Sequence, residues 1–75
     1  MNNARRKRLK EAQNLLDKAL DIIRDVLSEE DLAFNNLSEG LQQTLRGETM
    51  ENNVEELDEA SEQIENAINC LENVE

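Results

Sequence analysis

Apolar residues recur every three or four positions through the first half of the chain, as in a helix that packs lengthwise against another helix. The members of this seam are Leu9, Ala12, Leu16, Ala19, Ile23 and Val26. Two further sets flank it, Leu15 and Ile22 on one side and Leu20, Leu27 and Phe34 on the other. No glycine or proline interrupts this segment, so the pattern predicts a helix over about residues 4–34 that begins at Asn2 or Asn3. A stripe this wide is typical of a helical-bundle face.

The second half repeats the pattern and predicts a helix over about residues 45–74, with Thr44 as its N-cap. Its seam consists of Met50, Val54, Leu57, Ser61, Ile64, Ile68 and Leu71, with Ala60, Ala67 and Val74 beside it. Ser61 is the one polar residue in this seam. Its hydroxyl either marks the register of the helix pair or, as we expect, bonds to a carbonyl one turn earlier.

Residues 35–44 form the predicted linker between the two helices. Asn35 and Asn36 tolerate left-handed backbone angles, so we expect them to end the first helix. Ser38 is a suitable cap for a short helical turn within the linker. Gly47 falls on the seam side of the second helix, where the missing Cβ permits close approach of a ligand or, as we expect, relieves crowding at the bend. The sequence therefore predicts one all-α domain over residues 1–75, an antiparallel two-helix hairpin.

A single hairpin of 75 residues buries little surface and is marginally stable unless something is added. The one cysteine, Cys70, cannot form an internal disulfide. Self-association into a four-helix bundle would cover the apolar flanks, and such assemblies are usually two-fold symmetric. We therefore predict a homodimer or a higher oligomer.

The amino-acid composition argues against most kinds of catalytic site. The chain has no histidine, tryptophan or tyrosine, and Cys70 has no cationic neighbour in the sequence to activate it. A narrow hairpin also offers no concave, desolvated pocket. We expect no enzymatic activity, no cofactor and no metal site. No apolar run reaches membrane-spanning length and no signal peptide is evident, so we expect a cytoplasmic protein that does not enter membranes.

Charge is distributed very unevenly along the sequence. Residues 1–10 carry a net charge of +5, residues 11–46 carry −5 and residues 47–75 carry −10. The basic cluster lies at the start of a helix, where the helix dipole disfavours cations. In a hairpin it can pair with Glu65, Glu72 and Glu75 of the second helix. Alternatively, its members bind an anionic ligand or an acidic partner together with residues of the bend; this candidate site comprises Arg5, Arg6, Lys7, Arg8, Arg46 and Gly47.

A row of carboxylates follows one face of the second helix at spacings of three and four residues. Its members are Glu48, Glu51, Glu55, Asp58, Glu62 and Glu65. The simple interpretation is a solvated face that keeps the protein soluble. The functional interpretation is an acidic surface that imitates a phosphate backbone and binds a basic protein. Direct DNA binding is not expected from a chain with a net charge of −10.

Three segments resemble a group of small, acidic, uncharacterised proteins encoded by Firmicutes and their phages. The segments are the opening Asn3-Ala4-Arg5-Arg6-Lys7, the linker from Phe34 to Gln42, and Arg46-Gly47-Glu48. Within the linker, Ser38 stands where that group has proline. The resemblance implies a helical hairpin, a phage origin and a bacterial host cell, and it brings no known activity.

Two functions follow from these patterns. In the first, the chain is a non-enzymatic binding protein, such as a phage-encoded inhibitor of a host defence protein, that uses its acidic face or its exposed apolar flank. In the second, it is an oligomeric sponge that sequesters an anionic nucleotide signal between arginines of adjacent subunits. A structural bundle module without a ligand is the remaining alternative.

Overall fold

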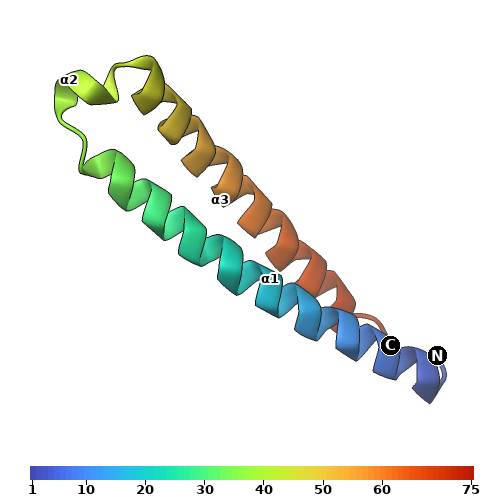
Figure 1. The fold of residues 1–75 in the computed structure, drawn as a ribbon. Helices are drawn as coiled ribbons and strands as arrows, with labels where there is room; N and C mark the ends of the chain where they lie inside the picture. Colours follow the sequence, from blue (N-terminus) through green and yellow to red (C-terminus); the bar gives the residue numbers. More distant parts are fainter.

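Two long antiparallel helices account for most of the chain in the computed structural model, which describes all 75 residues (Figure 1). Helix α1 spans Asn3–Asn35, the short helix α2 spans Glu39–Gln42, and helix α3 spans Leu45–Glu72. The resulting hairpin measures 58 × 15 × 13 Å. Both termini lie at one end, here called the tip, and α2 lies at the other end, the bend (Figure 1). The predicted all-α hairpin is confirmed.

Each helix begins at a polar side chain that accepts a hydrogen bond from the first turn. Asn2 caps α1 through Arg5 N (2.9 Å), Ser38 caps α2 through Leu41 N (3.4 Å), and Thr44 caps α3 through Gly47 N (3.4 Å). These caps were predicted. The predicted end of α1 is correct in place but wrong in conformation, because Asn36 is right-handed (φ −81°) and no residue has a positive φ.

The bend is held by one side chain and one close backbone contact. The side-chain amide of Gln42 donates hydrogen bonds to the carbonyl oxygens of Phe34 (3.3 Å) and Leu37 (3.0 Å), which tie α2 to the end of α1 and to the linker that follows it. Gly47, in the first turn of α3, is buried against the backbone of Gln42. A Cβ at Gly47 would lie 2.6 Å from the carbonyl carbon and 2.7 Å from the Cα of Gln42. The close approach of two backbones thus explains this glycine.

The seam of α1 differs from the predicted one. Leu20, Leu27 and Phe34, predicted as flanking residues, face α3 and are buried or half-buried, whereas Val26 is 42% exposed. The other five predicted members remain half-buried, so the buried stripe of α1 is wider than predicted and shifted toward the larger side chains; these five are Leu9, Ala12, Leu16, Ala19 and Ile23. On α3 the buried seam residues are Ser61 and Ile68.

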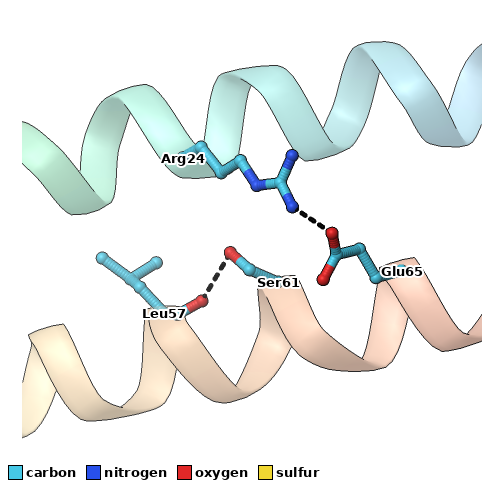
Figure 2. Close-up of polar contacts among 4 residues, drawn as sticks. All are labelled: Arg24, Leu57, Ser61 and Glu65. Atoms are coloured by element: carbon cyan, nitrogen blue, oxygen red, sulfur yellow. Dashed lines mark hydrogen bonds and ion pairs between the residues drawn. The ribbon is translucent and has the colours of Figure 1, made fainter.

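The core between the helices is thin. Only Leu20 (6% exposed) and Ile68 (9%) are buried apolar residues, and Ser61 (6%) lies among them. The Ser61 hydroxyl donates a hydrogen bond to the carbonyl oxygen of Leu57 at 2.9 Å, as predicted (Figure 2). The polar atom is thereby satisfied within its own helix, and it forms no hydrogen bond across the hairpin.

Candidate functional site

One ion pair defines the two sides of the hairpin. Arg24 of α1 pairs with Glu65 of α3 across the helix interface (Figure 2). Each of these residues directly follows a seam isoleucine, so the positions after Ile23 and Ile64 share one side of the seam. The seam residues of the neighbouring turns are Leu20, Leu27 and Ile68. The residues that directly precede these three lie on the opposite side of the seam. The two sides carry very different side chains.

The side opposite this ion pair is apolar. Leu15 is 62% exposed, Ile22 64% and Val26 42% on α1, and Val74 is 45% exposed after the end of α3. We name this surface the apolar face and define it as Ala12, Leu15, Ala19, Ile22 and Val26 of α1 with Ala60, Ala67, Cys70 and Val74 of the C-terminal segment. No charged residue lies within this set. Its small alanines flank the seam on both helices and permit close approach of another helix.

The side that carries the ion pair is acidic. We name it the acidic face and define it as the predicted carboxylate row of α3, namely Glu48, Glu51, Glu55, Asp58, Glu62 and Glu65. All six residues are exposed, and only Glu65 forms an ion pair. The Arg24–Glu65 pair is itself half-exposed (48% and 52%), so it contributes little to stability. The row therefore presents five unneutralised carboxylates to solvent.

The predicted pairing of the N-terminal cations with the side chains of Glu65, Glu72 and Glu75 is wrong. Glu65 pairs with Arg24 instead, and Glu72 forms no ion pair. Of the basic cluster, only Arg6 reaches the C-terminal segment, where its guanidinium donates a hydrogen bond to the backbone carbonyl oxygen of Glu75 at 2.9 Å. The physical reason is that α1 extends at the tip beyond the end of α3 (Figure 1), which leaves its first turns without a helix beside them.

The remaining cations of the tip have no acidic partner within the chain. Arg5, Lys7 and Arg8 make no ion pair and no side-chain hydrogen bond, and all three are exposed. Arg5 and Arg8 line a groove of about 330 Å³ together with Met1 and Leu9. Arg5 lies in the first turn of α1, where the helix dipole disfavours a cation, and Lys7, Arg8 and Lys10 follow it closely, so an external anion or carboxylate would stabilise this end of the helix.

Two members of the candidate basic site lie far from the others. Arg46 and Gly47 belong to the first turn of α3 at the bend, whereas Arg5 to Arg8 lie at the tip of the 58 Å hairpin. Gly47 is moreover covered by Gln42 and offers no surface to a ligand. A site that contains both Arg46 and the basic tip therefore requires two chains.

Surface hollows are shallow and lie along the helix pair. One, of about 370 Å³, is lined by Leu27, Asp31, Val54, Asp58 and their neighbours near the bend, and another, of about 320 Å³, lies at the tip beside Leu71. No three histidine, cysteine, aspartate or glutamate side chains converge as metal ligands would. Neither long helix contains an apolar stretch sufficient to cross a bilayer.

Sequence reasoning missed that the apolar face is a second, separate stripe. The signal was present as the heptad repeat Ala12, Ala19 and Val26, of which Ala19 and Val26 directly precede the seam residues Leu20 and Leu27. Assigning these residues to the hairpin seam concealed it.

The chain matches no protein-family model, no curated protein and no solved structure. Its function must therefore be argued from the two faces and the basic tip alone.

Proposed function

We propose that this chain is a non-enzymatic protein-binding module that pairs with a second copy through its apolar face and presents its acidic face to a basic partner. The observation that carries the proposal is the separation of surface types. Leu15 and Ile22, more than 60% exposed, lie on one side of the hairpin, and the unneutralised carboxylates lie on the other. Pairing of two apolar faces forms a four-helix bundle with the acidic faces outward.

Surface area supports this pairing. A folded monomer of 8.6 kDa is expected to expose about 4,700 Å², whereas this hairpin exposes 5884 Å². The excess of about 1,200 Å² is comparable to the roughly 800 Å² that each partner buries in a stable protein interface. Covering the apolar face with an identical face would therefore bring each chain to the exposure of an ordinary small protein.

Self-association is tested by size-exclusion chromatography with light scattering, followed by sedimentation equilibrium. We expect a dimer or an even-numbered oligomer for the wild-type chain. The double variant Leu15→Gln, Ile22→Gln should dissociate at least 100-fold more readily, because burying each such side chain contributes about 1.5–3 kcal/mol and a dimer contains two copies of each. A wild-type monomer would contradict the proposal.

Leu32 provides a matched control. It is 62% exposed, the same as Leu15, but it lies outside the apolar face. Leu32→Gln removes the same kind of side chain from the surface and should leave the oligomeric state unchanged. Equal dissociation of the Leu15 and Leu32 variants would show that the apolar face has no special role.

Binding of a basic protein, such as a host defence protein, is proposed from the acidic face. In the bundle this face points outward and stays accessible, and its regularly spaced carboxylates suit a protein groove that otherwise holds a nucleic-acid backbone. An inhibitor of phage origin would work in this way. The test is capture of bound proteins from a bacterial lysate and comparison with a variant in which four members of the acidic face become amides.

The altered residues are Glu51, Glu55, Asp58 and Glu62, and the matched control neutralises four exposed acids elsewhere, Glu11, Asp25, Glu56 and Glu59. Both variants carry the same net charge. A specific partner should bind the control and be lost from the acidic-face variant. Equal loss from both would indicate attraction to net charge alone.

The free cations of the tip favour a second candidate, sequestration of an anionic nucleotide. Arg5 and Arg8 line one groove without an intrachain partner, and Arg46 of an adjacent subunit would complete the predicted set. Thermal denaturation in the presence of cyclic nucleotides tests this candidate. A ligand at 100 times its Kd adds about 2.7 kcal/mol of stability, and the gain should vanish in the variant Arg5→Ala, Arg6→Ala.

A further inference from the structure

We infer that the second copy docks antiparallel to the first along α1, with the tip of each hairpin against the bend of the other and Arg8 of each chain paired with Glu29 of its neighbour. This inference rests on the proposed self-association and names the geometry of that same surface. Two observations carry it, the charge distribution along the hairpin and the order of residues along one stripe of α1.

Charge divides the hairpin into two very different halves. Residues 1–18 and 60–75, which form the half at the tip, contain six cations and six acids. Residues 19–59, which form the half at the bend, contain twelve acids and only two cations, Arg24 and Arg46. The bend half therefore carries the entire net charge of −10. A parallel dimer would place two such halves side by side, whereas an antiparallel dimer places each against the half that holds the basic tip.

The stripe that contains the apolar face of α1 has charged ends of opposite sign. Counting back from Ala12 at the same spacing of four and three residues reaches Arg8 and Arg5, and counting forward from Val26 reaches Glu29. The midpoint of the apolar residues is Ala19, which is also the midpoint of α1 (Asn3–Asn35).

A two-fold axis at Ala19 therefore superposes the stripe on its own reverse. Under this symmetry the residue opposite position n is 38 minus n, so Arg8 lies level with residue 30 of its neighbour, within one position of Glu29. Ala19 meets Ala19, which allows the two α1 helices to approach closely. In the parallel arrangement Arg8 would meet Arg8 and Glu29 would meet Glu29.

The antiparallel arrangement also resolves an otherwise unexplained feature of the tip. Arg5, Lys7 and Arg8 have no carboxylate partner in their own chain. At the level of the opposing bend lie Glu29, Glu30 and Asp31, none of which forms an ion pair within the chain. One docking geometry thus supplies partners for both clusters at once.

Distances between spin labels distinguish the two geometries. The labelled protein carries Cys70→Ala with either Leu32→Cys, outside the apolar face, or Lys18→Cys near the proposed axis. At 1.5 Å per residue, antiparallel docking separates two labels at position 32 by about 39 Å along the helices and two labels at position 18 by about 3 Å. Parallel docking gives both positions only the lateral separation of the two chains.

A long distance at position 32 together with a short one at position 18 is the expected result. Short distances at both positions would overturn the antiparallel geometry while leaving the proposed dimer intact. A monomer, by contrast, would refute the proposed self-association itself. The Leu32→Gln control above establishes whether position 32 tolerates substitution.

Charge reversal gives an independent test of the Arg8–Glu29 contact. Arg8→Glu and Glu29→Arg should each weaken the dimer about tenfold at low salt, because each replaces two ion pairs by two like-charge contacts. The double variant Arg8→Glu, Glu29→Arg should restore wild-type affinity. Single variants with wild-type affinity would overturn the contact, since in a parallel dimer each reversal exchanges one like-charge contact for another.

Discussion

Gly47 at the bend offers the sharpest test of the hairpin itself. Replacing it with alanine adds one methyl group 2.6 and 2.7 Å from the carbonyl carbon and Cα of Gln42, and closer still to its carbonyl oxygen. These are backbone atoms, so no side-chain rotation relieves the clash and either α2 or the start of α3 must move. Overpacking of this kind costs about 1–3 kcal/mol, whereas alanine gains about 1 kcal/mol of helix propensity over glycine. Because the clash is with backbone atoms, the cost should lie in the upper half of that range, and we expect a net destabilisation of about 1–2 kcal/mol.

Gly40 in α2 provides the matched control. A Cβ at this position would meet nothing within 4 Å, and the residue is helical with a negative φ. Gly40→Ala should therefore stabilise the protein by up to about 1 kcal/mol, through helix propensity and lower entropy of the unfolded chain. The same chemical change is thus expected to act in opposite directions at two positions seven residues apart.

The assay is thermal unfolding followed by circular dichroism at 222 nm, with all variants at one protein concentration because self-association contributes to stability. For a domain of this size, 1 kcal/mol corresponds to a shift in Tm of about 4–8 °C. Gly47→Ala should lower the Tm and Gly40→Ala should raise it. A Gly47→Ala protein as stable as the wild type would refute the argument that two backbones meet at the bend.

Three further outcomes are expected. Gln42→Ala removes the side-chain hydrogen bonds to Phe34 at the end of α1 and to Leu37 of the linker, and it should lower the free energy of unfolding by about 1–2 kcal/mol in urea titration, whereas Gln43→Ala should have little effect. Arg24→Gln breaks an ion pair that is half-exposed, so the same titration should show a change below about 1 kcal/mol; a larger loss would contradict the structure. Raising NaCl from 0.01 M to 0.15 M shortens the Debye length from about 30 to about 8 Å and should raise the Tm, because the carboxylates of the acidic face repel one another; a falling Tm would contradict this.

Helix boundaries and caps could be predicted because they depend on neighbouring residues. Asn2, Ser38 and Thr44 each accept a hydrogen bond from the backbone three residues later, and that spacing is visible in the sequence. The hydrogen bond from Ser61 to Leu57 is equally local. Interactions within one turn of a helix require no knowledge of the second helix, so sequence reasoning was reliable for them.

The residues by which α1 faces α3 could not be predicted in the same way. Apolar residues cover so much of its surface that both Val26 and Leu27 are suitable seam positions when α1 is considered alone. The choice depends on how α3 packs against α1, which the pattern of α1 alone does not reveal. The same limitation applied to the basic tip, because the sequence does not show that α1 extends past the end of α3.

The angle at which α3 leaves the bend also affects the position of its far end. Helix α3 contains 28 residues, so it is about 42 Å long; its first turn meets the backbone of Gln42 and the rest of it packs along α1. Tilting α3 by about 10° about its contact with Gln42 would displace its C-terminal end by about 7 Å, enough to separate Arg6 from Glu75. A small change of angle at the bend is therefore magnified at the opposite end of the rod, and the thin α1–α3 interface around Leu20, Ser61 and Ile68 is what resists it.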